Sequence, residues 1–170
     1  KDGVLVGENV KIASTVTIEA PAIIGHNSEL RPGAYIRGNV ITGSGCVLGN
    51  SSEYKNCILL DNVQTPHYNY VGDSVLGEYA HTGAGVILSN VKSDKKNIKI
   101  KINDEVIETN LRKFGSIICD HVEVGCNSVL CPGTVILSNS NIYPLTRVRG
   151  LINSNVIVKD MENIIEKEDR

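Results

Sequence analysis

The fold is decided by residues 4–36, which read VLVGENVKIASTVTIEAPAIIGHNSELRPGAYI. A long aliphatic residue returns there at every sixth position, namely at Val6, Ile12, Ile18, Ile24, Leu30 and Ile36. A small or β-branched residue stands two positions before each of them, at Val4, Val10, Val16, Ala22, Ser28 and Ala34. The same two registers return from residue 116 to residue 148, where the long residues are Ile118, Val124, Leu130, Ile136, Ile142 and Val148.

A period of six residues fits neither an α-helix nor a hairpin sheet, whose periods are about 3.6 and about two residues. It is typical of a β-helix built from hexapeptide repeats. In such a solenoid each short strand cannot bury its inner face alone, so successive coils stack to build the core. We therefore predict an all-β chain that folds as a parallel β-helix, with the long residue pointing inward and the small residue beside it.

The register is interrupted twice and ends before the C-terminus. It reaches Leu48 and Tyr54, falters across residues 60–66, and resumes with shifted phase at Tyr70, Leu76, Thr82 and Leu88. Residues 91–113 lose the pattern and are rich in lysine. Within them, residues 98–107 alternate around a turn at Asn103-Asp104, which predicts an extruded basic β-hairpin. We expect a repeat domain over residues 1–158 and a short C-terminal helix or tail over residues 159–170.

The pattern alone does not say what the insertion does. An insertion of this size either covers a binding face or is a tolerated surface loop.

Composition excludes several classes of function. The 170 residues suit one domain, and a net charge of −2 gives no electrostatic case for binding nucleic acid or an anionic membrane. No apolar run is long enough to predict a membrane span. The five cysteines form no C-x-x-C pair, which predicts reduced thiols in a cytoplasmic protein. The four histidines lack ligand spacing, so no metal site is predicted. Because the chain opens inside a repeat without Met, we expect a fragment that lacks an upstream domain.

Three stretches carry a family resemblance: LRPGAYIRG (30–38), NSSEYKNC (50–57) and TPHYNYVGDSVLGEYAHTGAGVILSN (65–90). Together with the basic insertion, they resemble the C-terminal acetyltransferase domain of bifunctional sugar-1-phosphate nucleotidylyltransferases, bacterial and archaeal. The resemblance covers roughly residues 20–150. It implies a left-handed β-helix that forms a homotrimer, uses acetyl-CoA and acetylates an amino-sugar 1-phosphate. The family's N-terminal nucleotidylyltransferase domain is absent from this chain.

The resemblance also implies roles for individual residues. His67 matches the catalytic base, and imidazole suits the removal of a proton from an attacking amine at neutral pH. Glu53 matches the acidic residue that orients this imidazole. Ala84 matches the residue whose backbone N–H faces the thioester oxygen. Cationic side chains match phosphate contacts, because a phosphate requires fixed positive charge; they are Arg31, Lys55, Lys96 and, from the archaeal relatives, Lys99.

The remaining matches concern the sugar and the coenzyme. Tyr70 and Asn90 match positions that hold the sugar, and Ala84, Cys126 and Pro144 are assigned to the coenzyme. Two positions depart from the family pattern: His81 stands where Asn is usual, and Cys126 stands near a usual Ser. The implied function is N-acetylation of a hexosamine 1-phosphate, with glucosamine 1-phosphate the first choice, in UDP-N-acetylhexosamine synthesis.

Two alternatives remain open. His81 favours an acyltransferase that acts on another amino sugar. The β-helix could also be a non-catalytic trimerising or regulatory module of a nucleotidylyltransferase.

Overall fold

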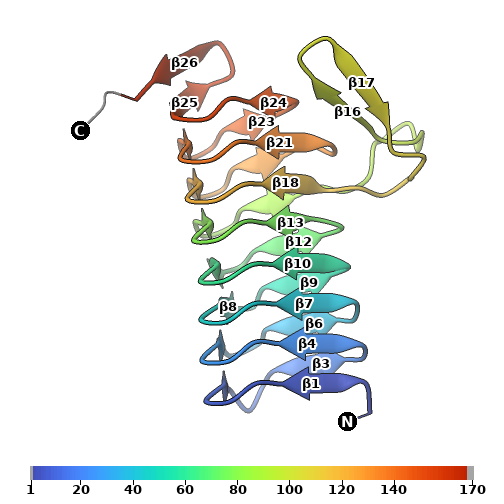
Figure 1. Ribbon diagram of the computed structural model, residues 1–170, viewed down its shortest axis with the longest axis vertical. Helices are drawn as coiled ribbons and strands as arrows, with labels where there is room; N and C mark the ends of the chain where they lie inside the picture. Colours follow the sequence, from blue (N-terminus) through green and yellow to red (C-terminus); the bar gives the residue numbers. More distant parts are fainter. Residues whose placement is uncertain (1, 168–170) are drawn as a thin grey trace.

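Three parallel sheets surround one apolar core in the computed structural model, which describes residues 2–167 (Figure 1). The chain rises as a left-handed coil, and each turn of the coil except the last contributes one short strand to each sheet. The predicted left-handed parallel β-helix is therefore confirmed. Its inner face is lined by the long residues of the repeat, including Ile24, Leu48 and Leu130, which are almost fully buried.

The strands are grouped by sheet in their spatial order. Sheet A contains β1 (Val4–Val6), β4 (Ala22–Ile24), β7 (Val40–Thr42), β10 (Cys57–Leu59), β13 (Val75–Leu76), β18 (Ser116–Ile118), β21 (Thr134–Ile136) and β24 (Leu151–Ile152). Sheet B contains β2 (Lys11–Ile12), β5 (Glu29–Leu30), β8 (Val47–Asn50), β11 (Gln64–His67), β14 (His81–Thr82), β19 (Glu123–Val124), β22 (Asn141–Ile142), β25 (Val156–Asp160) and β26 (Asn163–Glu166). Sheet C contains β3 (Thr17–Glu19), β6 (Tyr35–Arg37), β9 (Glu53–Lys55), β12 (Tyr70–Gly72), β15 (Ile87–Leu88), β20 (Val129–Leu130) and β23 (Arg147–Val148).

The faltering register reflects a change in coil length. Val4 pairs with Ala22 across an 18-residue coil, whereas Ile58 pairs with Val75 across a 17-residue coil. The shorter coils move the inward position by one residue, so Val71 is buried and Tyr70 faces outward, half-exposed. The prediction that Tyr70 continues the core register is therefore wrong, because a six-residue count cannot follow a side of the coil that has five residues.

The insertion forms the predicted β-hairpin. Strands β16 (Lys99–Ile102) and β17 (Glu105–Glu108) pair antiparallel around Asn103-Asp104. Ile98 and Ile100 are buried, with 0% and 7% of their surface exposed, so the first strand of the hairpin is anchored in the protein, whereas β17 is exposed along its whole length. A Cβ on Gly133 would lie 2.7 Å from the Lys99 carbonyl oxygen, so this contact requires glycine.

The predicted C-terminal helix is wrong. The chain reverses after β25, where the Glu162 N–H donates to the Asp160 carboxylate at 2.8 Å, and β26 returns antiparallel to β25. The last coil leaves an open row of backbone N–H and C=O groups, which a strand can satisfy and a helix cannot. Residues 168–170, the end of the predicted helix or tail, lie outside the described residues.

Residues 2–167 contain no helix that is long and apolar enough to cross a membrane. In the same range, no three His, Cys, Asp or Glu side chains form a group that could hold a metal ion.

Candidate active site

One corner of the prism, between sheets B and C, aligns four residues from four successive coils. These residues are His67, Ala84, Cys126 and Pro144, and we call them the corner column. Backbone hydrogen bonds tie each coil to the next: Gly85 N–H donates to His67 O (3.0 Å), Asn127 N–H to Ala84 O (2.8 Å), and Leu145 N–H to Cys126 O (2.9 Å). Stacked strands lie about 4.7–4.9 Å apart, so the column forms a continuous edge that an extended ligand can follow. The structure thus brings together the predicted base and all the predicted coenzyme residues.

His67 ends β11 with its side chain exposed, and a buried side chain positions its backbone. The side chain of Asn69 is buried; its Oδ1 accepts from His67 N–H at 3.2 Å and its Nδ2 donates to Gly83 O at 2.8 Å. Asn69 therefore couples the base to the next coil, directly before Ala84. Sequence reasoning missed this residue, although Asn is conspicuous at a place where the coils below carry Ala34 and Ser52.

The backbone N–H of Ala84 has no acceptor among the described residues. Glycines on both sides keep the surroundings of this group free of side chains. A Cβ on Gly83 would lie 2.8 Å from the Cys126 nitrogen, and Gly85 has a φ of +74°. An open N–H one coil above an exposed imidazole is compatible with the predicted role of Ala84 in binding an oxyanion next to a base.

The corner between sheets C and A carries a ladder of amide and carboxylate side chains. Asn39 donates to Asn56 (2.9 Å), Asn56 donates to Asp73 (3.0 Å), and Asn90 donates to both Asp73 (2.5 Å) and the Tyr70 hydroxyl (3.1 Å). The ladder joins the two predicted sugar residues, Tyr70 and Asn90. Burial raises the pKa of the Tyr70 phenol, so its O–H stays available as a donor.

Asp73 was missed from the sequence, although Asn39, Asn56, Asp73 and Asn90 follow one another at 17-residue intervals. This spacing equals the shorter coil length and could have revealed the ladder.

Glu53 lies on the outer face of sheet C, directly below Tyr70 in the strand register. Its carboxylate binds the Arg37 guanidinium at 2.5 Å, and no hydrogen bond joins Glu53 to His67 within the described chain. The role of Glu53 in orienting His67 remains a prediction, while Arg37 is an additional cation that the sequence did not reveal.

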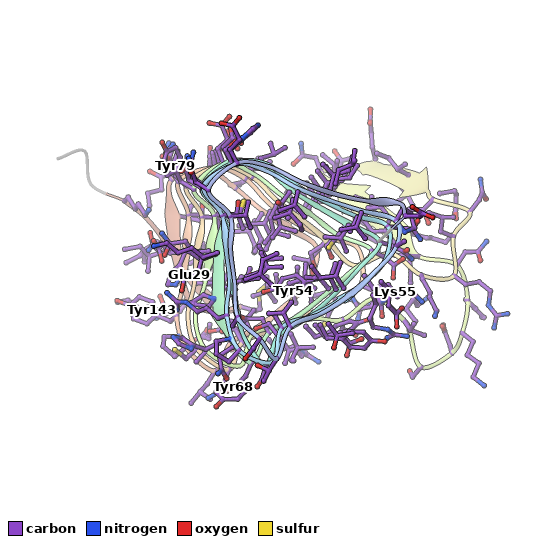
Figure 2. All side chains as sticks on the ribbon, turned by 90° about the horizontal axis from the view of Figure 1, so that it is seen from below. Glu29, Tyr54, Lys55, Tyr68, Tyr79 and Tyr143 are labelled. Carbon is purple, nitrogen blue, oxygen red and sulfur yellow. The ribbon has the colours of Figure 1, made fainter. Side chains whose placement is uncertain are left out.

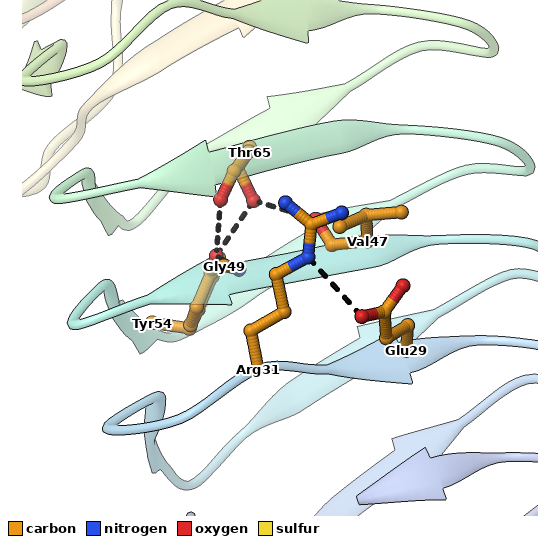
Figure 3. A network of polar contacts seen from close by, with 6 residues as sticks. All are labelled: Glu29, Arg31, Val47, Gly49, Tyr54 and Thr65. Atoms are coloured by element: carbon orange, nitrogen blue, oxygen red, sulfur yellow. Dashed lines mark hydrogen bonds and ion pairs between the residues drawn. The ribbon is translucent and has the colours of Figure 1, made fainter. Parts of the chain in front are cut away.

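Arg31 lies just after β5, on the sheet B side of the prism, where its Nε binds the Glu29 carboxylate at 3.2 Å (Figure 3). The adjacent interior holds the fully buried Tyr54. Its hydroxyl accepts from Gly49 N–H at 3.0 Å and lies 2.6 Å from Thr65 Oγ1. Burial raises the pKa of Tyr54 to about 12, so this hydroxyl is neutral at physiological pH. Through Thr65 it holds the strand β11, which ends at His67.

His81 lies on the outer face of sheet B, with its Nδ1 at 2.7 Å from the Glu123 carboxylate of the next coil. A carboxylate–histidine pair thus occurs within the described chain at His81, a pairing that the sequence did not predict, while the predicted pairing of Glu53 with His67 remains a prediction.

The predicted phosphate cations other than Arg31 lie near the opposite end of sheet C. Lys55 ends β9 and is half-buried. Lys96 is exposed on the insertion and has no ion pair among the described residues, whereas Lys99 binds Glu108 at 2.5 Å across the hairpin.

The predicted site residues therefore fall into two sets at two different corners. Figure 2, along the axis of the prism, shows Tyr68, the neighbour of His67, at one corner and Lys55 at another. The corner column, Arg31 and His81 belong to the first corner or to the sheet B face beside it. Lys55, Asn90, Lys96 and Lys99 belong to the second corner. Glu53 and Tyr70 lie on the sheet C face between them.

The fold and the six-residue repeat define the class of protein to which the chain belongs, the hexapeptide-repeat β-helix proteins. The chain belongs to the family of the GMPPB C-terminal domain, whose model matches residues 18–143.

Similarity to individual proteins agrees with this family. The chain is 35% identical to "Bifunctional protein GlmU" of Methanococcus aeolicus, over 94% of the chain and 43% of that protein. It is also 35% identical to a "Bifunctional sugar-1-phosphate nucleotidylyltransferase/acetyltransferase" of Sulfurisphaera tokodaii, over 82% of the chain and 38% of that protein. The chain thus spans less than half the length of these relatives.

Among solved structures, a variant of AntD, an N-acyltransferase from Bacillus cereus in complex with dTDP and coenzyme A, matches with a TM-score of 0.55. The match has 17% identity over 97% of the chain and 83% of AntD. At this identity the match supports the fold.

Proposed function

We propose that the chain is an acetyl-CoA-dependent N-acetyltransferase that acts on a hexosamine 1-phosphate, with glucosamine 1-phosphate as the first candidate. The observation that carries the proposal is the corner column, in which an exposed imidazole stands one coil below an unpaired backbone N–H. The name of the Sulfurisphaera tokodaii relative, which includes an acetyltransferase activity, supports the same proposal.

The reaction follows from these groups. The amine of the sugar attacks the thioester carbon, and His67 takes the proton that the nitrogen loses. The Ala84 N–H binds the oxyanion of the tetrahedral intermediate. The C–S bond then breaks, and the proton held by His67 passes to the departing coenzyme thiolate. Tyr70 and Asn90 hold the sugar hydroxyls, while Lys55 and Lys96 neutralise its phosphate.

A homotrimer would unite the two sets of residues. Within one chain, the corner column and the Tyr70–Asn90 ladder lie at different corners, so a single copy presents two half-sites. Cyclic closure places the first corner of one copy against the second corner of its neighbour and completes three equal sites. In each of these sites, Arg31 and His81 come from one chain and Lys55 comes from the neighbouring chain.

Thiol release tests the function. Purified chain with acetyl-CoA is supplied with a panel of hexosamines, each with and without a 1-phosphate, and free coenzyme thiol is followed with time. Turnover with a hexosamine 1-phosphate, and little with the unphosphorylated sugar, is the expected result. No thiol release with any amine would contradict the proposal and favour the non-catalytic module.

A second candidate rests on the His81–Glu123 pair. A carboxylate that accepts from Nδ1–H leaves Nε2 free to accept a proton, which is the geometry of an oriented base. His81 could in this way serve an amine placed differently from that of glucosamine 1-phosphate. Preference of the enzyme for another amino sugar in the same panel, lost in His81→Asn, would support this alternative.

A further inference from the structure

The ladder of side chains at the corner between sheets C and A has a fixed hydrogen-bond direction. Asp73 is the carboxylate among its amides. One carboxylate oxygen accepts from Asn56 at 3.0 Å, and the other accepts from Asn90 at 2.5 Å. An ionised carboxylate accepts hydrogen bonds and cannot donate them. Each amide must therefore turn its NH2 group toward Asp73, so this carboxylate sets the orientation of both amides.

The direction continues away from Asp73 on both sides. Below it, the side-chain oxygen of Asn56 accepts from Asn39 at 2.9 Å. Above it, the second N–H of Asn90 donates to the Tyr70 hydroxyl oxygen at 3.1 Å. Both hydrogens of the Asn90 amide are then used, and within the described part of the chain no group donates to its Oδ1. The hydrogen of the Tyr70 hydroxyl has no acceptor among residues 2–167. Asn90 therefore presents an acceptor, and Tyr70 presents a donor.

The backbone around the ladder holds these groups in place. The Asp73 N–H donates to the Lys55 carbonyl at 2.9 Å, and the Gly115 N–H donates to the Asp73 carbonyl at 2.8 Å. The Phe114 N–H donates to the Asn90 carbonyl at 3.0 Å. The chain thus returns from the insertion directly onto Asn90 and Asp73, and this return fixes their relative position.

Gly72 provides the space in which Tyr70 meets Asn90. A Cβ at this position would lie 2.5 Å from the Tyr70 hydroxyl oxygen and 2.8 Å from the Asn90 Nδ2. The coil below carries Lys55 in the same register position, so the repeat itself does not require glycine here. The glycine is needed for the contact between the tyrosine hydroxyl and the amide.

We propose that Asp73 is a positioning residue of the sugar site, which fixes the donor and acceptor directions of Tyr70 and Asn90 and so selects one hydroxyl group of the acceptor. A hydroxyl can accept from the Tyr70 O–H and donate to the Asn90 Oδ1 at the same time, whereas an ether oxygen can only accept. The assignment of a sugar to these residues rests on the proposed function. The direction of the ladder rests on its own contacts.

Calorimetric titration of the whole chain tests this role without requiring turnover. The test variant Asp73→Asn keeps the shape of the side chain but can donate as well as accept, so the Asn90 amide loses its fixed orientation. The probes are glucosamine 1-phosphate and its 3-deoxy, 4-deoxy and 6-deoxy analogues. One control, Asp61→Asn, makes the same change at the corner between sheets A and B, where the carboxylate accepts from the Ser44 N–H. The other, Asn39→Ala, removes the exposed end of the ladder.

A mismatched hydrogen bond in the site predicts that Asp73→Asn binds glucosamine 1-phosphate at least about 5-fold more weakly than the wild type, against about 2-fold or less for the controls. One deoxy analogue should bind the wild type and Asp73→Asn with equal affinity, because it lacks the hydroxyl whose contacts the variant disturbs. The other two analogues should show the same loss as glucosamine 1-phosphate.

Two results would overturn the positioning role. Equal losses for all four probes would make Asp73 a structural residue, and an unchanged affinity for glucosamine 1-phosphate in Asp73→Asn would show that it does not control the site. The proposed function fails in a different way. Binding of the probes without thiol release would overturn acetyl transfer, while the affinities still decide the role of Asp73. No binding of any probe to the wild type would overturn the proposed substrate and this role together.

Discussion

At the scale of single residues, the candidate site depends on side chains and backbone groups that the β-helix does not need. His67 is exposed at a corner, and the Ala84 N–H has no acceptor among the described residues. Asn69 binds both the backbone N–H of His67 and the carbonyl that precedes Ala84, so it sets their relative position.

Replacement of His67 by Ala should lower kcat about 10²- to 10⁴-fold, with little change in acetyl-CoA binding, because a general base contributes in that range. His121→Ala is the matched control. That imidazole stacks on Tyr79, 5.0 Å between ring centroids, at a different corner. Steady-state thiol release measures both variants. Unchanged turnover in His67→Ala would place the base elsewhere, with His81 tested next.

Replacement of Asn69 by Ala should destabilise the fold by about 2 kcal/mol, since it leaves buried N–H and C=O groups without partners. It should also lower kcat more than it raises KM, because the imidazole and the Ala84 N–H lose their fixed relation. Urea unfolding and steady-state kinetics give the two values. Asn141→Ala, at a half-buried strand position of sheet B, should change stability by less than about 0.5 kcal/mol. Equal losses of stability in the two variants would contradict the positioning role.

At the scale of elements, the hairpin insertion is anchored to the prism along its first strand, while its second strand is exposed. Its apolar edge is buried through Ile98 and Ile100, and Gly133 lets its backbone approach the coil. The same insertion carries Lys96 into solvent, close in sequence to Asn90.

Gly133→Ala should lower stability more than Gly150→Ala. Both glycines have positive φ (+80° and +84°), so each variant carries the strain of about 1–2 kcal/mol that a side chain meets in this region. Only at Gly133 would the new Cβ collide with another backbone, that of Lys99, whereas nothing lies within 4 Å at Gly150. Amide exchange at Ile98 and Ile100 should rise only in Gly133→Ala. Equal melting temperatures for the two variants would show that the hairpin is not held by this contact.

Lys96→Ala should mainly raise KM for a hexosamine 1-phosphate. Loss of one charge-assisted contact of about 1.5–3 kcal/mol predicts a decrease in kcat/KM of about 10- to 150-fold. Added salt should reproduce part of the loss in the wild type, because an exposed charge is screened. An unphosphorylated hexosamine should be no worse a substrate for the variant than for the wild type. Equal damage to both substrates would assign Lys96 to the coenzyme or to structure.

At the scale of the whole molecule, the prism separates the predicted site residues between two corners. The corner column faces one direction, and the ladder with the insertion faces another (Figure 2). Under the proposed function a complete site needs a second copy of the chain, and we expect the parallel coils to keep the two halves at matching levels.

Light scattering should give three times the mass of the 18.4 kDa chain at micromolar concentration. A mixing experiment tests whether the sites are shared. His67→Ala and Asn90→Ala chains, each inactive alone, are co-refolded in equal amounts. Random assembly places two intact halves together in about one quarter of the sites of a cyclic trimer, so about one quarter of wild-type activity should return. A monomeric mass, or no recovery on mixing, would contradict the shared site.

The sequence by itself determined the β-helix and the hairpin, and it predicted most of the candidate site residues. Each of these depends on a local pattern: six-residue periodicity, alternation around a turn, or a motif such as the one that contains His67. The tertiary structure decided which residues meet. Which residues stack above one another depends on the summed lengths of the coils between them. The change in coil length from 18 to 17 residues moved Tyr70 to the outer face. The partners of Glu53 and His81 also depend on stacking between distant segments. The C-terminal strand formed because the last coil presents unpaired backbone groups, a demand that no local sequence pattern records.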